Sequence, residues 1–348
     1  MIDEAALKSY TVREDDYLFE AVRKLSRNEH KGIIALDNDN KVCGTFTRAD
    51  MVRCSHLMGM QDVKLGDFIN REFFALYEEQ KPDQVYHSII PVTDKEGCLT
   101  DIYFPPKKEM VKYDFPVAVM AGGRGTRLYP YTKVLPKPLV PLVGEKPMIE
   151  TIMDRFHDYG PDNFYMIVNY KKEMIIDYFR DADLDYQVHF AEEKIPLGTG
   201  GGLYMLRDKI KDTFCLTNCD IILQENLSEI YEFHKESGNL ITMITSLMSI
   251  DVPYGVIKVD DRQQIVDMIE KPTYLVLVNI GIYFIEPEVF DLIEDNVYID
   301  FPSVIDKVKK AGRPVGIYPI TDDMWMDMGQ VSSYEHAKEV LQMKLKKE

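Results

Sequence analysis

A glycine-rich segment with two arginines follows an apolar run near the middle of the chain. It reads VAVMAGGRGTR and places Gly122, Gly123 and Gly125 directly after the apolar stretch. Glycine accepts positive φ and lets the backbone approach a ligand closely, and successive N–H groups in such a loop can form an anion-binding nest. Arg127 ends the segment, and Lys137 follows between the two prolines of PKPL. These groups predict a site for a nucleoside triphosphate, and the structural alternative is a tight turn with surface arginines.

Two acidic residues have positions from which they could bind a metal ion. Asp220 ends the apolar run TFCLTNCD, and Asp327 lies in WMDMG, far along the chain. Mg²⁺ binds to carboxylate oxygens together with substrate phosphates and keeps several waters. Two carboxylates brought together from distant strands would meet that need. The alternatives are that Asp220 caps a helix beginning near Leu227, or that either acid is simply exposed.

The surrounding pattern predicts how these residues are positioned. After a proline-rich and charged segment at 105–114, apolar runs alternate with helical patterns, and the early runs are nearly continuous, as in a parallel sheet covered on both faces. Ligands in such sheets bind at the carboxyl ends of the strands. Strands are predicted at 117–121, 164–170, 186–192, 213–220, 240–247, 255–260, 278–287 and 314–320, and helices at 147–160, 171–181, 200–210, 226–238, 301–312 and 332–348.

The segment before residue 105 has a different pattern of predicted helices and strands. An amphipathic helix is predicted at 15–28, strands at 32–37 and 42–47, and a second helix at 49–58. A weaker copy of the strand–turn–strand pattern follows at 84–104, which predicts two related modules of about 50–60 residues. We therefore expect two domains, at 1–112 and 113–348.

Several further motifs follow the glycine loop, and the chain resembles the sugar 1-phosphate nucleotidyltransferases, also called sugar-nucleotide pyrophosphorylases. The motifs are MAGGRGTRLYP, PKPL, IPLGTGGGL, CD after a strand, PYGV, IEKP, VNIGIYF and WMDMG, in that order. The resemblance implies an α/β fold, a Rossmann-like mixed-sheet domain of the GT-A-like kind. It also implies a reaction in which an NTP and a sugar 1-phosphate give an NDP-sugar and pyrophosphate.

The resemblance also assigns roles to residues at the matching positions. Asp220 and Asp327 would hold Mg²⁺, Arg127 would cover the departing phosphates, and Lys137 would stabilise charge at the α-phosphorus. Many relatives have Gly-Asp where this chain has Cys219-Asp220; because cysteine is small, we expect the metal site to be kept. The predicted nucleotide-binding residues are Ala121, Gly122, Gly123, Gly125, Thr126, Glu193, Gly198 and Thr199, and the predicted sugar-phosphate-binding residues are Gly255, Glu270, Lys271 and Asn279. For Glu270 and Lys271 the alternative is a solvated surface pair.

Glu193 suggests which base is bound. It precedes PLGT, where thymidylyl-transferring relatives place a glutamine, and the EE-x-x-P-L-G-T pattern is similar to guanylyltransferases. A carboxylate only accepts hydrogen bonds, and guanine alone offers two adjacent donors, N1–H and its amine. The sequence therefore favours GTP, and the alternative is that Glu193 points to solvent while the backbone reads the base.

The N-terminal part carries a second resemblance. GTFTRAD, at 44–50, resembles the end of a cystathionine-β-synthase (CBS) repeat, so the two copies are identified as a small α+β CBS pair. The resemblance implies that Thr47 and Asp50 contact the phosphate and ribose of an adenosine nucleotide. The second copy lacks the Thr-x-x-Asp ending, which leaves a purely structural or dimerising role as the alternative.

The composition limits the remaining function classes. A net charge of −17 disfavours binding to nucleic acid or to an anionic membrane, and no apolar run is long enough for a membrane span. The acidic N-terminus does not resemble a signal peptide, and five widely spaced cysteines indicate reduced thiols in a cytoplasmic protein. A homo-oligomer is also expected. A nucleotide-sugar sensor without activity is the second hypothesis. Five charged residues of the motifs favour the enzyme by their presence: Arg127, Lys137, Asp220, Lys271 and Asp327.

Overall fold

The computed structural model describes residues 4–28, 30–54, 63–77, 80, 89–106 and 110–345. The chain divides into two compact units. The first comprises Met1–Lys108, Ser246–Val278 and Pro319–Asp323, and the second comprises Glu109–Thr245, Asn279–Tyr318 and Met324–Glu348. The first unit thus gains two segments from the C-terminal two-thirds of the chain, and domains at 1–112 and 113–348 stay a prediction.

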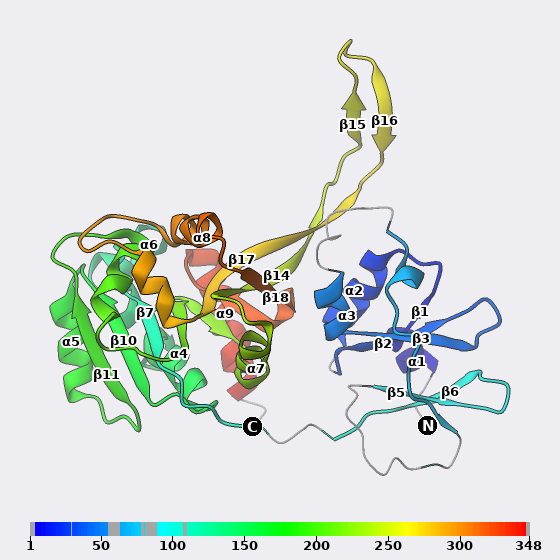
Figure 1. Cartoon of the computed structure of the whole chain (residues 1–348), viewed down its shortest axis with the longest axis horizontal. Coiled ribbons are helices and arrows are strands. Elements are labelled where there is room, and N and C mark those ends of the chain that lie inside the picture. Colours follow the sequence, from blue (N-terminus) through cyan, green and yellow to red (C-terminus); the bar gives the residue numbers. More distant parts are fainter. Residues whose placement is uncertain are drawn as a thin grey trace. The chain divides into compact units, whose positions relative to one another are not determined.

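The second unit is built on a mixed sheet, which is seven-stranded among the described residues and has the order β11-β10-β7-β12-β17-β14-β18 (Figure 1). Strands β7, β10, β11 and β12 are parallel, whereas β17 runs antiparallel to β12. Val117, Ala118 and Val119 of the central β7 are fully buried, as their apolar pattern predicts. The predicted α/β fold is therefore confirmed. The strands are β7 (Val117–Met120), β10 (Asn163–Val168), β11 (Gln187–Glu192), β12 (Phe214–Asn218), β14 (Ile241–Asp251), β17 (Thr273–Ile285) and β18 (Val315–Thr321).

Helices cover both faces of this sheet. Val304 and Val308 of α8 pack with Tyr283 and Ile285 of β17 in one apolar cluster. The intervening Phe284 points to the opposite face, where it contacts the ring of Tyr231 from α7. The helices of this unit are α4 (Met148–His157), α5 (Lys172–Asp181), α6 (Gly198–Gly201), α7 (Leu227–Ser237), α8 (Phe301–Lys310) and α9 (Val331–Leu345), with the 3₁₀ segments η6 (Gly202–Leu206) and η7 (Pro287–Leu292).

The helix predicted at 200–210 is shorter than expected and continues as the 3₁₀ turn η6. Its glycines pack directly against the segment before α8, where the N–H groups of Gly200 and Gly201 both donate to the carbonyl of Ile299, at 2.9 and 3.0 Å. A side chain on Gly200 would lie 2.8 Å from a methyl group of Val304. Close backbone packing, which only glycine permits, therefore replaces the regular helix.

Two small antiparallel sheets in the second unit were not predicted. β13 (Ile221–Leu223) pairs with β19 (Trp325–Asp327), and β8 (Pro141–Val143) pairs with β9 (Lys146–Pro147). In the first of these sheets Ile221 lies opposite Asp327. Because Asp220 directly precedes Ile221, this pairing brings together two acids that are far apart in the sequence.

The first unit repeats one strand arrangement. β1 is parallel to β2 and β2 antiparallel to β3, and likewise β4 is parallel to β5 and β5 antiparallel to β6. Asp37 and Asp94 begin the corresponding turns, and each carboxylate accepts two backbone N–H bonds at 2.9 Å. This matches the expected two-copy organisation, although residues 55–62 and 81–88 lie outside the described residues. The elements are α1 (Glu4–Tyr10), β1 (Thr11–Arg13), α2 (Leu18–Arg27), β2 (Gly32–Leu36), β3 (Val42–Thr47), α3 (Arg48–Arg53), η2 (Leu65–Asp67), β4 (Leu76–Tyr77), β5 (Ile90–Thr93) and β6 (Leu99–Tyr103).

A two-stranded hairpin completes the first unit. It consists of β15 (Val256–Val259), which was predicted, and β16 (Ile265–Ile269), which was not. Figure 1 shows it as a narrow ribbon that continues from β14 and β17. At its base, Leu247 belongs to the apolar core of this unit, and Leu275 and Leu277 pack against that core. In the part of the chain that the structure describes, no helix is long and apolar enough to cross a membrane.

Candidate active site

The glycine loop begins where the central strand β7 ends. The N–H of Ala121 donates to the carbonyl of Ile167 at 2.9 Å, which ties the start of the loop to β10. Gly125 has φ 63°, and a Cβ there would lie 2.9 Å from Cβ of Lys137, so the turn itself requires glycine. A Cβ on Gly123 would meet nothing within 4 Å. Packing therefore does not explain Gly123, whereas a ligand that approaches the backbone would.

Lys137 and Asp220 form an ion pair. Lys137 begins the 3₁₀ turn η5 (Lys137–Leu139), directly after Pro136, and its ammonium contacts Oδ2 of Asp220. Their side chains are only 12% and 9% exposed. Removing either partner would leave a largely buried charge uncompensated. The ion pair therefore keeps one positive and one negative side chain in direct contact.

Asp220, Asp327 and Arg127 converge on Gly329. The N–H of Gly329 donates to Oδ1 of Asp327 at 2.7 Å, and the N–H of Met328 donates to the carbonyl of Asp220 at 2.8 Å. A Cβ built on Gly329 would lie 2.7 Å from Oδ2 of Asp220, 2.9 Å from Oδ1 of Asp327 and 3.5 Å from Nη2 of Arg127. The two carboxylate oxygens thus face one small space. Gly329 was not singled out from the sequence, although it ends the WMDMG motif.

These three charged residues line a cavity of about 250 Å³. Asn279, a predicted sugar-site residue, also lines it, and its Nδ2 donates to the hydroxyl of Tyr283 at 2.6 Å. Sequence reasoning missed Asn218, which stands two residues before Asp220 at the end of β12. The other lining residues are Ile221, Ile280, Gly281, Tyr283 and Trp325.

The two aspartates fit the donor set that Mg²⁺ requires. Mg²⁺ prefers hard oxygen ligands and is commonly held by one or two carboxylates, with substrate phosphates and water completing the shell. Among the described residues there is no cluster of three or more His, Cys, Asp or Glu side chains that could hold a metal, so an all-protein cage is not indicated. Burial raises the pKa of Cys219, the residue before Asp220, to about 12, so this thiol is protonated near neutral pH. The helix-cap alternative for Asp220 is wrong, since Asn226 caps α7.

Glu193 points inward. It is only 6% exposed, and burial raises the pKa of its carboxyl group despite a 3.3 Å bond from the N–H of Leu197 to Oε1. Its Oε2 lies 3.0 Å from a Cβ built on Gly122, and its Oε1 lies 2.9 Å from one built on Gly202. The carboxylate is therefore next to the glycine loop and does not face solvent, contrary to the alternative. Its role in reading the base stays a prediction.

Gly198 and Thr199 have structural partners. The Thr199 hydroxyl accepts the N–H of Phe301 at 2.9 Å, and the Thr199 N–H donates to Oδ1 of Asp300 at 3.3 Å. Gly198 has φ 80°, in the region that favours glycine. These contacts position the start of α8, and nucleotide binding by the two residues stays a prediction. Thr126 and Arg127 are exposed on the neighbouring turn η3 (Thr126–Leu128).

The other predicted sugar-site residues belong to the first unit. Gly255, Glu270 and Lys271 are all exposed and lie beside the hairpin strands β15 and β16. A Cβ on Gly255 would lie 3.0 Å from Oε2 of Glu270, so these two positions face each other. Lys271 has φ 47°, an uncommon backbone conformation for a side-chain-bearing residue. Their role at the sugar phosphate stays a prediction.

Thr47 and Asp50 cap a helix in the first unit. The N–H and the hydroxyl of Thr47 donate to Oδ2 of Asp50 at 2.7 and 2.9 Å, and Arg53 pairs with Oδ1. This is a capping box at the start of α3. Binding of an adenosine nucleotide at these residues stays a prediction.

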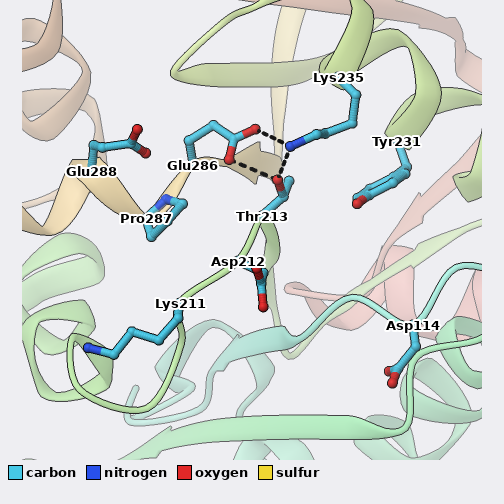
Figure 2. A pocket seen from close by; sticks show the side chains of 9 residues that line it. All are labelled: Asp114, Lys211, Asp212, Thr213, Tyr231, Lys235, Glu286, Pro287 and Glu288. Carbon is cyan, nitrogen blue, oxygen red and sulfur yellow. Dashed lines mark hydrogen bonds and ion pairs between the residues drawn. The ribbon is translucent and has the colours of Figure 1, made fainter.

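A second cavity, of about 330 Å³, lies at the other end of β12 (Figure 2). Lys235 donates to Thr213 at 2.8 Å and to Oε1 of Glu286 at 2.9 Å, and the Thr213 hydroxyl donates to Oε2 of Glu286 at 2.8 Å. Thr213 precedes β12, whereas Asp220 follows it. Because ligands of such sheets bind beyond the carboxyl ends of the parallel strands, the cavity at Asp220 is the candidate active site.

The whole of this site lies within one family match. A family model described as nucleotidyl transferase matches residues 117–344. The chain belongs to the nucleotidyl transferase family. A model described as CBS domain matches residues 5–56, which confirms the second resemblance for the first copy. The family resemblance predicted from the motifs is thus confirmed.

Individual members of the nucleotidyl transferase family differ in their named substrates. The chain is 32% identical over 228 residues to a probable mannose-1-phosphate guanylyltransferase 1 from Oryza sativa, a match that covers 62% of each chain. It is 30% identical over 244 residues to a UTP–glucose-1-phosphate uridylyltransferase from Synechocystis, covering 63% of this chain and 61% of the relative. It therefore spans about three fifths of the length of these curated relatives. The crystal structure of HddC from Yersinia pseudotuberculosis is similar with a TM-score of 0.51 at 25% identity, covering 65% of this chain and 99% of that one.

Proposed function

We propose that this chain transfers a nucleotidyl group from an NTP, preferentially GTP, to a sugar 1-phosphate and releases pyrophosphate. The sugar would be a hexose, an amino sugar or a heptose, and the product a precursor for glycan synthesis. One observation carries the proposal: Asp220, Asp327 and Arg127 converge at Gly329, beside a glycine loop that follows the central strand. Two acids that would hold Mg²⁺, together with an arginine, would compensate the negative charge of the phosphates of two substrates.

The reaction requires positioning and charge compensation. An oxygen of the sugar phosphate attacks the α-phosphorus of the NTP, the new P–O bond forms in line, and the bond to the β-phosphate bridging oxygen breaks. No general base is needed, because the attacking phosphate is already anionic near neutral pH. Asp220 and Asp327 would hold Mg²⁺, which when bound neutralises phosphate charge. Arg127 would bind the departing pyrophosphate.

Lys137 would act at the α-phosphate. Its ion pair with Asp220 keeps its ammonium group beside the metal-binding carboxylate before substrates bind. The α-phosphate oxygens offer Lys137 a second anionic partner, and their charge increases as the fifth oxygen approaches phosphorus. The ion pair therefore orients the lysine without a covalent or proton-transfer role.

The preference for GTP rests on Glu193. Its buried carboxylate lies against Gly122 of the glycine loop, and a buried acceptor pair left unmatched by the wrong base costs binding energy. Guanine is the base that supplies two adjacent donors. The relatives include guanylyl- and uridylyltransferases by name, so the base has to be measured.

Release of pyrophosphate tests the proposal. The protein would be mixed with Mg²⁺, each of the four NTPs in turn and a panel of sugar 1-phosphates. We expect release that depends on both substrates and is fastest with GTP. If nucleotide sugars bind but no NTP and sugar phosphate pair yields pyrophosphate, the sensor hypothesis replaces the enzyme.

The first unit would serve regulation or assembly. We place an adenosine nucleotide at its CBS pair, and a homo-oligomer in the cytoplasm, where the five free cysteines would stay reduced. Equilibrium dialysis with ATP, ADP and AMP tests the ligand. Absence of binding by all three would leave the pair with a structural role.

A further inference from the structure

The turn between β10 and α5 contacts the residue that is proposed to read the base. β10 lies between β7 and β11 in the sheet (Figure 1). It ends at Val168, and Asn169 is the first residue of the turn. The Nδ2 of Asn169 donates to the carbonyl of Glu193 at 3.1 Å. A side chain that follows one strand therefore fixes the backbone that follows the next.

This bond takes the place of a backbone bond between the two strands. β10 and β11 are parallel, and the N–H of Glu193 donates to the carbonyl of Val168 at 2.9 Å. In a regular parallel ladder the carbonyl of Glu193 would next accept from the N–H of Tyr170. That N–H donates instead to the carbonyl of Gly122, at 3.3 Å. The side chain of Asn169 therefore supplies the donor that the backbone has given to the glycine loop.

Asn169 and Glu193 also adjoin the same glycine. A Cβ built on Gly122 would lie 3.0 Å from Oε2 of Glu193 and 3.2 Å from Cβ of Asn169. Beyond Glu193 the chain enters three exposed residues, at 194–196. The bond from Asn169 thus holds Glu193 beside the glycine loop, at the point where the chain leaves the sheet.

Lys171 holds the turn itself in place. Its φ of 51° is uncommon for a residue with a side chain, and its ammonium donates to the carbonyls of Lys133 and Val134 at 2.8 and 2.6 Å. These bonds do not involve the side chain of Asn169. Removing that side chain should therefore leave the turn in place and act on Glu193.

We infer that Asn169 is a positioning residue for base selection, because its bond to the carbonyl of Glu193 sets where the Glu193 carboxylate meets the base. The inference rests on the proposed function. A carboxylate selects guanine only if both of its oxygens reach the two adjacent donors of that base. The carboxylate moves with the backbone that carries it, so a loosened carbonyl at Glu193 lets the oxygens miss those donors.

Asn169→Ala removes the donor and keeps the Cβ beside Gly122. Its effect is measured as pyrophosphate release with GTP and with UTP, at saturating Mg²⁺ and the sugar 1-phosphate that wild type uses best. We expect KM for GTP to rise about three- to tenfold, as for the loss of one hydrogen bond, with kcat nearly unchanged. The constants for UTP should change little, because uracil does not match the carboxylate. The margin of GTP over UTP in kcat/KM therefore falls by the same factor.

Asn163→Ala is the matched control. Asn163 begins β10 at its other end, where its Oδ1 lies 3.4 Å from Nε2 of His189 on β11. The same substitution thus removes a link between the same two strands, away from the glycine loop, and should leave the margin unchanged. A loss of activity in Asn169→Ala that is equal for GTP and UTP, or a margin like that of wild type, overturns the inference.

A double-mutant cycle tests whether Asn169 acts through Glu193. In a Glu193→Gln protein, Asn169→Ala should lower the margin no further, because the group that it positions is already altered. Additive losses of the margin would show that the two residues act independently, which contradicts the inference.

Failure of the proposed function would be recognised separately. If wild type releases no pyrophosphate, that proposal fails, and equilibrium dialysis of GTP and UTP with wild type and Asn169→Ala still decides the role of Asn169. A ratio of the two dissociation constants that the substitution leaves unchanged, or a wild type that binds both nucleotides equally, overturns the inference. If wild type prefers UTP, the guanine assignment is wrong, and Asn169→Ala should then reduce the preference for UTP.

Discussion

The convergence of two carboxylates on Gly329 makes Gly329→Ala an informative substitution. The new methyl carbon would lie 2.7 Å from Oδ2 of Asp220 and 2.9 Å from Oδ1 of Asp327, both shorter than normal contacts. The carboxylates would have to separate to admit it, which disturbs the space proposed for Mg²⁺. Overpacking of this kind costs about 1–3 kcal/mol. Lost positioning of one strong electrostatic contact lowers turnover about 10²–10³-fold.

The assay is pyrophosphate release as a function of Mg²⁺ concentration. We expect a lower kcat and a higher Mg²⁺ concentration for half-maximal activity, with a circular dichroism spectrum like that of wild type. Ser332→Ala is the matched control, since Ser332 is exposed at the start of α9, three residues further on. Wild-type turnover and Mg²⁺ dependence in a folded Gly329→Ala protein would refute the metal site at this position.

The remaining predictions concern the charged groups of the second unit. Asp220→Asn should lower turnover by at least about 10²-fold in a folded protein; near-normal turnover at limiting Mg²⁺ would remove Asp220 from the metal site. Lys137→Ala should depress kcat more than it raises KM for the NTP, and an effect on KM alone would make Lys137 a uniform binder. GTP should exceed the other NTPs in kcat/KM by more than about tenfold, and Glu193→Gln should reduce that margin; better use of UTP or CTP by wild type would contradict the interpretation of Glu193. Burial lowers the pKa of His234 from 6.5 to about 4, so the folded state binds fewer protons than the unfolded state between these values. The free energy of unfolding should therefore fall on acidification from pH 6.5 to 4, by up to about 3 kcal/mol, and His234→Gln should flatten this dependence in urea titrations.

Much of the candidate site could be predicted because the sequence patterns that indicate it each lie within one short segment. The run VAVMA followed by three glycines predicts a buried strand and a loop open to a ligand, and β7 and its loop have that form. The run ending in Asp220 likewise predicts an acid at the carboxyl end of a strand, where β12 ends two residues earlier. Burial of a strand depends on its own apolar pattern, so a single segment carries the information.

The position of Asp327 beside Asp220 was decided by tertiary structure. It depends on β13 and β19, two three-residue strands whose patterns are too short to stand out. The same holds for Gly329, whose importance follows from two carboxylates that approach it from different segments. The broken helix at 200–210 is similar, since Gly200 and Gly201 pack on a backbone segment almost one hundred residues away.

For this protein, then, the sequence by itself predicted which residues bind phosphate, metal and sugar, and at which strand ends most of them lie. The tertiary structure alone decided that Asp220, Asp327 and Arg127 share one cavity, that Glu193 faces the glycine loop, and that Gly255 and Glu270 face each other beside the hairpin. The physical reason is the separation along the chain of the residues that interact. Strand and loop preferences arise from neighbouring residues, whereas the meeting of side chains depends on pairings between segments that no local pattern encodes.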